Sequence, residues 1–245
     1  MLNPKKSLGQ NFLIDKNICR KIINLTDVYK KEVIEIGPGT GQITDEIIKK
    51  NPKKLLLIEK DDKLFILLKK KYRKYEYVKI DNNDALNYDY SSFNNAIIFS
   101  NLPYNMSVKL IIHLLKMKKK FSELILMVQK EVAEKMNYRN RKKNNRLSFF
   151  IEVVSNYSIK FEISNNVFFP KPKIKSCVIK IKPKNYQKIN ILRLELFSKE
   201  IFKYKRKKIS NILNFKNLNK KYEYLINKRA EDLNTADLLI LFNEF

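Results

Sequence analysis

A chain of 245 residues has room for one well-cored α/β domain and a smaller appended domain. Its 51 Lys and Arg against 25 Asp and Glu give a formal net charge of +26, so we expect nucleic acid as the partner. An AT-biased genome, which enriches Lys, Asn and Ile, would account for part of this basic excess. Two distant cysteines and one histidine exclude a Cys/His metal site, and no apolar run reaches membrane-spanning length, so we expect a metal-free protein of the reducing cytoplasm with no membrane partner.

Short apolar runs alternate with amphipathic segments over the first half of the chain. The apolar runs, predicted as buried strands, are residues 32–36, 54–58, 77–80, 96–100 and 124–128. The amphipathic segments 42–50, 62–71 and 108–116 carry apolar positions at helical spacing, with lysine on the opposite face. This alternation predicts an α/β fold with a doubly wound, mostly parallel Rossmann-like sheet and helices on both of its faces.

The second half of the chain has a different pattern. A helix is predicted at 129–136, a basic loop at 139–146, a further apolar segment at 147–155, and two strands at 157–163 and 176–181 that end the sheet as a pair. From about Pro183 the pattern is helical, most clearly at 194–202, 209–213 and 236–242. We therefore expect a first domain of residues 1–183 and a small helical domain of residues 184–245.

Three of the four glycines, Gly37, Gly39 and Gly41, lie within five residues, directly after the strand predicted at 32–36. Glycine permits positive φ and a close approach of the main chain to a ligand, so this loop is a candidate nucleotide-binding loop. The dinucleotide fingerprint Gly-x-Gly-x-x-Gly would require glycine at position 42, where Gln42 stands. A cofactor with a pyrophosphate is therefore disfavoured.

Acidic residues follow the next two predicted strands. Glu59 is placed to accept hydrogen bonds from both hydroxyls of a ribose, and Asp84 could accept one from an adenine amino group. Because the carboxyl ends of parallel strands form one crevice, the two acids behind the glycine loop describe an adenosine without phosphates, as in S-adenosylmethionine. The alternatives are a solvated charged turn at Glu59 and a cap by Asp84 on the turn that begins at Ala85.

The fourth predicted strand is followed by Asn101-Leu102-Pro103-Tyr104. An amine conjugated with a purine is a poor nucleophile, because its lone pair is delocalised into the ring. The Asn101 oxygen and a main-chain carbonyl at Leu102 or Pro103 can accept both amine hydrogens and favour a pyramidal nitrogen, while Tyr104 stacks on an extruded base. The tetrapeptide thus predicts methyl transfer to an adenine amine without a catalytic histidine. An ordinary Asn-x-Pro turn with a core tyrosine is the alternative.

The chain resembles the KsgA-type adenine dimethyltransferases of small-subunit ribosomal RNA, which share a fold with the Erm-type enzymes of large-subunit RNA. The resemblance is carried by residues 6–13 (KSLGQNFL), 33–41 (VIEIGPGTG), 101–107 (NLPYNMS), 129–134 (QKEVAE), 146–148 (RLS), 168–173 (FFPKPK) and 229–231 (RAE). Asn83 and Val108 depart from the glycine and threonine usual in the family. Neither departure removes a catalytic group.

The resemblance implies roles for particular residues. It implies that S-adenosylmethionine is held by Asn11, Leu13, Gly37, Gly39, Glu59, Asp84 and Asn101, and that Phe168 joins Tyr104, beside Leu102 and Pro103, in enclosing the target adenine. It further implies action on two adjacent adenines in a loop of small-subunit ribosomal RNA, with a helical tail that helps to dock the RNA. We expect the protein to be a monomer. Candidate phosphate contacts are Arg139, Arg141, Lys142 and Lys143 in one basic run and Lys205, Arg206, Lys207 and Lys208 in another, although either run could be plain solvated surface.

Three other functions are compatible with these motifs. An Erm-type large-subunit enzyme is the nearest, but Leu102, the Leu-Gly-Gln at 8–10 and the appended tail favour the small subunit. A non-catalytic assembly or transcription factor of the same fold would be supported by loss of Asn101 or Glu59, and both are present. A DNA adenine methyltransferase would prefer a double proline before its tyrosine and a larger target-recognition domain.

Overall fold

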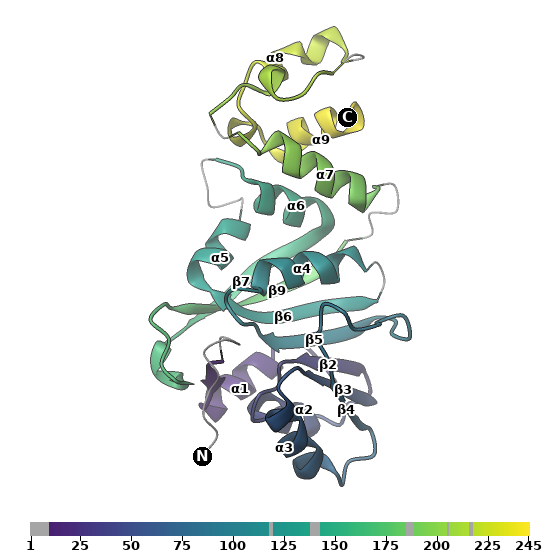
Figure 1. Cartoon of the computed structure of the whole chain (residues 1–245), viewed down its shortest axis with the longest axis vertical. Coiled ribbons are helices and arrows are strands. Elements are labelled where there is room, and N and C mark those ends of the chain that lie inside the picture. The colour runs from purple at the N-terminus through teal and green to yellow at the C-terminus, as the bar shows by residue number, and fades with distance from the viewer. Residues whose placement is uncertain (1–9, 118–119, 138–142, 185–188, 205, 216–217) are drawn as a thin grey trace. The chain divides into compact units, whose positions relative to one another are not determined.

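The computed structural model describes residues 10–117, 120–137, 143–184, 189–204, 206–215 and 218–245 (Figure 1). The chain divides into two compact units: unit 1 consists of Met1–Ala133 and Ser158–Pro183, and unit 2 of Glu134–Tyr157 and Lys184–Phe245. The segment 134–157 therefore groups with the carboxy-terminal residues, whereas the sequence pattern places it in the first domain. The assignment of a separate function to each domain stays a prediction.

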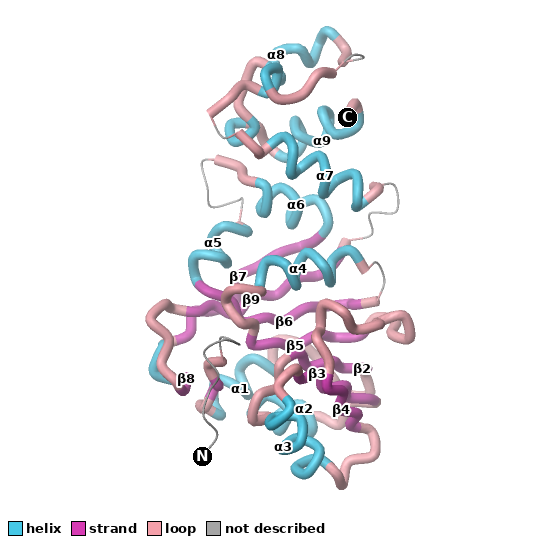
Figure 2. Tube along the Cα trace, in the orientation of Figure 1, coloured by secondary structure: helices cyan, strands magenta, loops and turns pink. Residues whose placement is uncertain are grey.

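A seven-stranded sheet has the order β4-β3-β2-β5-β6-β9-β7 (Figure 2). Its strands are β2 (Glu32–Ile36), β3 (Lys54–Glu59), β4 (Val78–Asn82), β5 (Ala96–Asn101), β6 (Phe121–Gln129), β7 (Ser155–Ile163) and β9 (Ser176–Pro183). Neighbours from β4 to β6 are parallel, whereas β9 pairs with β6 antiparallel. The predicted mostly parallel sheet, ending in a strand pair, is confirmed. The chain order changes direction between β2 and β5, which places a ligand crevice at their carboxyl ends.

Four helices of unit 1 cover the two faces of this sheet (Figure 1). They are α1 (Lys16–Ile23), α2 (Gln42–Ile48), α3 (Asp62–Tyr72) and α4 (Ser107–Lys116). Asp15 begins α1 and Asp61 begins α3, each by accepting bonds from two backbone N–H groups of the first turn. Because helices cover both faces, Leu55, Leu56 and Leu57 of β3 are all fully buried, and the strand shows a continuous apolar run instead of alternation.

A second, two-stranded sheet was not predicted. It pairs β1 (Phe12–Leu13) with β8 (Phe168–Phe169) in antiparallel register, Phe12 opposite Phe169 and Leu13 opposite Phe168. Ile14 extends the pairing, since its N–H donates to the Val167 carbonyl at 2.9 Å. Strands of two residues are too short to carry any periodicity, so only pairing across the chain defines them. This sheet brings the amino-terminal segment beside the segment that precedes β9.

Unit 2 is built around packed aromatic rings. Phe197 is fully buried on α7 (Ile191–Ile201), with ring centroids 6.0 Å from Phe149 of α6 (Arg146–Val154) and 5.6 Å from Phe242 of α9 (Thr235–Asn243). The helices α5 (Lys130–Met136) and α8 (Glu223–Ile226) complete the α-helices of the described residues. The predicted helical tail is confirmed by α7 and α9, but the stretch predicted at 209–213 forms only a 3₁₀ turn, Ile209–Asn211.

Candidate active site

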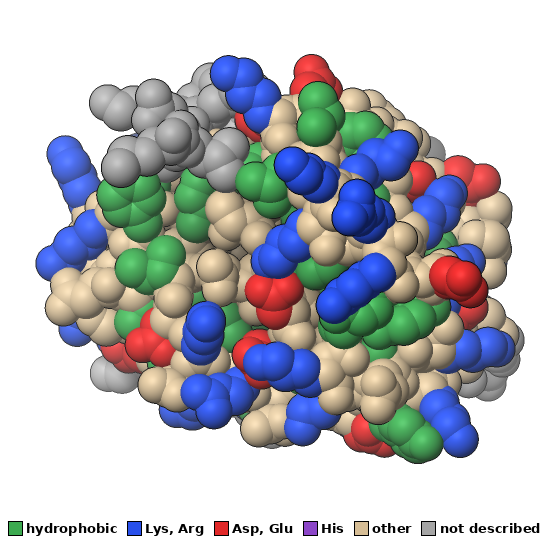
Figure 3. Space-filling view, turned by 90° about the horizontal axis from the view of Figure 1, so that it is seen from below, with side chains coloured by type: hydrophobic (Ala, Val, Ile, Leu, Met, Phe, Trp, Pro, Cys, Tyr) green, Lys and Arg blue, Asp and Glu red, His purple; other side chains and the backbone are tan. Residues whose placement is uncertain are grey.

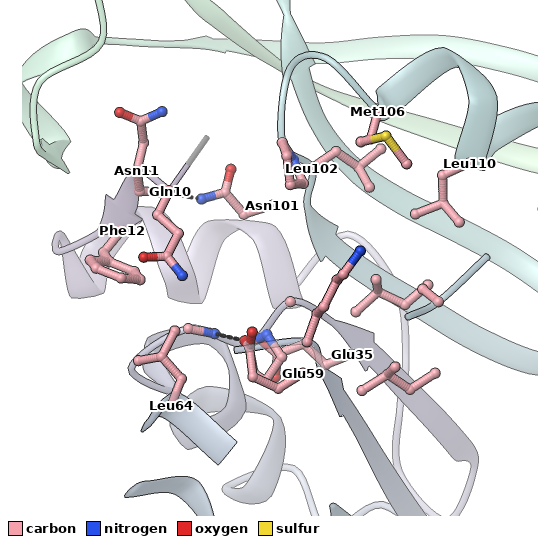
Figure 4. Close-up of a pocket in the computed structure, with 18 of the residues that line it drawn as sticks. Gln10, Asn11, Phe12, Glu35, Glu59, Leu64, Asn101, Leu102, Met106 and Leu110 are labelled. Atoms are coloured by element: carbon pink, nitrogen blue, oxygen red, sulfur yellow. Dashed lines mark hydrogen bonds between the residues drawn. The ribbon is translucent and has the colours of Figure 1, made fainter. Parts of the chain in front are cut away.

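A cavity of about 260 Å³ opens in unit 1 at the carboxyl ends of β2, β3 and β5 (Figure 4). The predicted residues that line it are Asn11, Leu13, Gly37, Gly39, Glu59, Asp84, Asn101, Leu102, Pro103 and Tyr104. In Figure 4, Gln10, Asn11 and Phe12 lie on one side of the cavity, and Met106 and Leu110 lie on the other. Segments far apart in the sequence therefore contribute to one crevice, at the place where an open parallel sheet binds ligands.

The glycine loop presents bare backbone to this cavity. Gly37, Gly39 and Gly41 have φ values of +65°, +59° and +83°, a backbone region that residues other than glycine rarely adopt. At Gly37 the position of a Cβ is open space, whereas at Gly39 it lies only 2.9 Å from the Phe12 ring. The space beside Gly37 is therefore available to a ligand. The ring of Phe12, from β1, packs against the loop at Gly39.

The end of α3 holds the glycine loop in place. The Tyr72 hydroxyl lies 2.8 Å from the Gly41 carbonyl and 2.7 Å from Asp45 Oδ1, and Lys71 Nζ lies 3.1 Å from the Thr40 carbonyl. Burial, followed by the hydrogen bond to the Asp45 carboxylate, raises the pKa of Tyr72, so the hydroxyl keeps its proton and remains a donor. No sequence pattern indicates this contact, because a tyrosine and lysine at a helix end normally face solvent.

Glu59 is the last residue of β3 and only 5% exposed. Its Oε2 accepts a bond from the Gly39 N–H at 3.2 Å and its Oε1 accepts one from the Asp61 N–H at 2.9 Å. Burial raises its pKa, and these backbone bonds oppose the rise. A carboxylate accepts about four hydrogen bonds, so this side chain is fixed in position yet keeps acceptor capacity for ligand hydroxyls. The alternative of a solvated charged turn does not fit so buried a group.

Asp84 follows β4, and its carboxylate fills the capping role that its position suggested. Its Oδ1 accepts a bond from the Leu86 N–H at 3.0 Å, which caps the local turn, and its Oδ2 lies 2.9 Å from Lys60 Nζ. Burial alone would raise its pKa, but the Leu86 N–H and the Lys60 ammonium outweigh burial and lower it. The carboxylate is thus ionised at the cavity edge, with a lysine partner that no motif in the sequence indicated.

Asn101 is the last residue of β5, and a contact with the amino-terminal segment orients its side-chain amide. Nδ2 of Asn101 donates to the Asn11 main-chain carbonyl at 2.7 Å (Figure 4). A carbonyl only accepts hydrogen bonds, so the NH₂ end of the amide must face Asn11 and the oxygen must lie at the opposite end. This contact therefore fixes which atom of Asn101 is available as an acceptor.

The rest of the tetrapeptide is held by backbone bonds. The Leu102 N–H donates to the Met127 carbonyl of β6 at 3.2 Å, and the Pro103 carbonyl accepts from the Met106 N–H at 3.0 Å. Pro103 therefore uses its carbonyl in the turn, and Leu102 is the better candidate for the second amine acceptor. The Tyr104 hydroxyl lies 2.9 Å from Ser176 Oγ, and burial raises its pKa, so it stays neutral.

Glu35 is a second buried acid at the cavity. The Thr44 hydroxyl donates to its Oε2 at 2.5 Å, and burial raises its pKa from 4.5 to about 8. Between those pH values the folded protein keeps a proton that the unfolded chain releases, so the contribution of Glu35 to stability is full below about pH 4.5 and is lost as the pH rises towards 8.

In the wild type, the free energy of unfolding should decrease between pH 5 and 8. Glu35→Gln should make this decrease smaller, by on the order of a few kcal/mol over that range. Urea unfolding at several pH values measures this slope. Glu123→Gln is the control: burial would raise the pKa of Glu123, but Lys180 and Lys182, each 2.7 Å away, lower it from 4.5 to about 2. Its contribution to stability is lost only below about pH 4.5, so this variant should keep the wild-type slope between pH 5 and 8. Equal slopes for wild type and Glu35→Gln would contradict the assignment.

Phe168 and the basic runs are placed differently from the rest. Phe168 is only 4% exposed, pairs with Leu13 and does not line the cavity, because β8 turns it into the core. Lys143 Nζ lies 2.6 Å from Glu231, so its charge is already paired. Of the other candidate phosphate contacts, Arg206, Lys207 and Lys208 are exposed, whereas Arg139, Arg141, Lys142 and Lys205 lie outside the described residues. On the face seen in Figure 3, Lys and Arg side chains are spread over the surface among Asp and Glu.

The described part of the chain contains no group of three or more His, Cys, Asp or Glu residues arranged to hold a metal ion. Among the same residues, no helix combines the length and apolar character needed to cross a membrane. Among the described residues that line the cavity, the charged side chains are the carboxylates of Glu35, Glu59 and Asp84 and the ammonium of Lys60.

Two solved structures have a similar fold over nearly the whole chain. A dimethyladenosine transferase from Plasmodium falciparum superposes with a TM-score of 0.80 at 24% identity, over 96% of this chain and 97% of that one. The 23S rRNA methyltransferase ErmE gives a TM-score of 0.70 at 18% identity, over 95% and 98%. At these identities the likeness supports the Rossmann-like fold.

Sequence comparison gives the family. The family model described as ribosomal RNA adenine dimethylase matches residues 1–245. The chain is 37% identical to ribosomal RNA small subunit methyltransferase A of Hydrogenobaculum sp. (strain Y04AAS1), over 99% of this chain and 94% of that protein. It is 35% identical to the protein of the same name from Mycoplasmopsis synoviae (strain 53), over 98% and 96%. The chain therefore belongs to the ribosomal RNA adenine dimethylase family.

Proposed function

We propose that this protein uses S-adenosylmethionine to dimethylate the exocyclic amines of two adjacent adenines in a loop of small-subunit ribosomal RNA. The observation that carries the proposal is the Asn101 amide, oriented by the Asn11 carbonyl at 2.7 Å in the same cavity as the buried Glu59. An acceptor for an amine and an acceptor for ribose hydroxyls in one cavity fit methyl transfer to an adenine. The enzyme acts, in this proposal, as a monomer in the cytoplasm.

The cavity residues fit S-adenosylmethionine. The open space beside Gly37 would accept a ligand where a side chain would fill it, and the fixed Glu59 carboxylate suits a ribose with two hydroxyls. Asp84, paired with Lys60, lies at the edge where an adenine amino group would seek an acceptor. When bound, S-adenosylmethionine supplies an activated methyl group on a positively charged sulfur.

The tetrapeptide prepares the target amine. The Asn101 oxygen and the Leu102 carbonyl would each accept one amine hydrogen, which localises the nitrogen lone pair and aims it along a single direction. The Tyr104 ring, held through its hydroxyl by Ser176, offers a flat surface on which an extruded adenine can stack. The proton left on the nitrogen after transfer is acidic, because the ring withdraws electrons, and water is a sufficient acceptor.

The test is a methylation assay with undermethylated small subunits, large subunits and labelled S-adenosylmethionine, followed by identification of the modified nucleoside. Dimethyladenosine in small-subunit RNA alone is the expected result. Label in large-subunit RNA would favour the Erm-type alternative. Binding of small subunits without methylation of either RNA would favour a non-catalytic assembly factor. The relatives at 35 to 37% identity bear the small-subunit name, which supports the expected outcome.

Tyr72→Phe should weaken binding of S-adenosylhomocysteine about 3- to 10-fold, because one hydrogen bond is worth about 0.5–1.5 kcal/mol and its removal here releases the glycine loop at Gly41. Calorimetry measures this affinity. Tyr75→Phe is the matched control, since Tyr75 packs on Tyr72 with ring centroids 6.4 Å apart and does not line the cavity. An unchanged affinity for Tyr72→Phe would show that the loop holds its shape without the hydroxyl.

A further inference from the structure

The segment of residues 169–175 runs from the last residue of β8 to the residue before β9, and contacts at both of its ends tie it to residues that line the cavity. At one end Phe169 pairs with Phe12 across the two-stranded sheet. At the other end Ser176, the first residue of β9, bonds the Tyr104 hydroxyl at 2.9 Å. Phe12 and Tyr104 both line the cavity. The 169–175 segment is therefore anchored beside the cavity at both ends, at the amino-terminal strand and at the proposed adenine-stacking tyrosine.

This segment exposes an aromatic ring beside a buried one. Phe168 is 4% exposed and packs in the core, whereas Phe169, on the opposite face of the same short strand, is 56% exposed. A phenylalanine ring exposed to this degree gains little from the fold, because most of its apolar surface stays in water. Ile174, also in the segment, is exposed as well. Folding therefore does not account for an aromatic residue at position 169.

All of the charged side chains in the segment are lysines. The sequence contains no Asp or Glu from Ser164 to Lys184, and Lys171, Lys173 and Lys175 are all exposed. The Lys130 ammonium, 2.5 Å from Glu162, lowers the pKa of that acid, and the charge of Lys175 adds to the effect. Lys171 and Lys173, by contrast, form no ion pair with any acid of the described residues. Two lysines thus remain available to phosphates next to the exposed ring.

We propose that the 169–175 segment binds the RNA strand that flanks the target adenine, with Phe169 stacked on a neighbouring base and Lys171 and Lys173 on its phosphates. The inference rests on the proposed function, since it supplies the strand contact that an extruded adenine requires. Exposed aromatic rings interleaved with lysine are the usual means of holding single-stranded nucleic acid, because every base has a flat face that can stack. The segment adds affinity for RNA and leaves the methyl-donor site unchanged.

Phe169→Ala is the first test, with the intact protein and undermethylated small subunits. We expect KM for the subunit to rise about 5- to 30-fold, while kcat and the affinity for S-adenosylhomocysteine stay unchanged. Phe169→Tyr should restore KM, because a tyrosine ring stacks equally well. Tyr29→Ala is the matched control: Tyr29 is 53% exposed, but it precedes the amino end of β2, away from the crevice.

The lysines are tested by salt dependence. The double variant Lys171→Ala, Lys173→Ala should reduce the slope of log affinity against log salt by about 2, one for each phosphate that is no longer neutralised. Lys50→Ala with Lys70→Ala, two exposed lysines outside the cavity and the segment, should reduce it far less.

Two kinds of failure are distinguishable. If wild type methylates small subunits but Phe169→Ala and Tyr29→Ala have the same KM, the strand contact is wrong and the proposed function stands. If wild type binds S-adenosylhomocysteine and methylates neither subunit, the proposed function itself is wrong. A captured protein partner that Phe169→Ala releases, with no change in RNA affinity, would also overturn the inference.

Discussion

Asn101→Ala is expected to lower the rate of methyl transfer about 100- to 1,000-fold, the usual cost of removing one preorganised hydrogen-bonding group from an active site. The side-chain oxygen is the acceptor that would draw one hydrogen of the adenine amine out of the ring plane. Its direction is fixed in advance by the bond from Nδ2 to the Asn11 carbonyl at 2.7 Å. Alanine removes both the acceptor and its anchor, so the amine would remain planar and weakly nucleophilic.

The measurement is single-turnover methylation of undermethylated small subunits, with S-adenosylhomocysteine binding measured beside it. Asn101→Asp separates the two roles of the amide, because a carboxylate still accepts a hydrogen bond but cannot donate to the Asn11 carbonyl. It should also be slow. Asn87→Ala, an exposed asparagine outside the cavity, is the control and should keep the wild-type rate. A rate within about threefold of wild type for Asn101→Ala would remove Asn101 from the mechanism.

Glu59→Gln is expected to weaken binding of S-adenosylhomocysteine about 100-fold. The carboxylate accepts bonds from the Gly39 and Asp61 N–H groups, one at each oxygen. A glutamine has only one oxygen, so its NH₂ would face one of these two donors at a buried position. The two hydrogen bonds to the ribose hydroxyls would weaken, and the glutamine NH₂ would face a backbone N–H that also donates. Together these changes should cost about 3 kcal/mol of binding free energy, which is about a 100-fold loss of affinity.

Calorimetric titration with S-adenosylhomocysteine measures this weakening. Glu76→Gln is the matched control, since Glu76 is an exposed acid outside the cavity, and it should bind as wild type does. Thermal unfolding in the absence of ligand separates a defect in binding from a defect in folding. A folded Glu59→Gln protein with unchanged affinity would show that the ribose is held elsewhere.

The parallel sheet and the position of its crevice follow from sequence pattern alone. Buried parallel strands are continuous apolar runs, and chemistry placed at their carboxyl ends must converge, so the order of the chain is enough to group Gly37, Glu59, Asp84 and Asn101. The glycine loop is recognisable for a local reason, because its positive φ values admit few other residues. The helical tail follows from its periodicity.

The groups that hold these residues in place, by contrast, are defined by the packing of the whole chain. Asn11 and Asn101 are 90 residues apart, and Tyr72 lies 31 residues from Gly41, so neither contact leaves a local pattern in the sequence. The pairing of β1 with β8 buries Phe168 and exposes Phe169, a choice that strands of two residues cannot reveal by alternation. Hydrogen bonds and strand pairs between distant segments form only when the tertiary structure brings those segments together, and for that reason sequence spacing could not predict them.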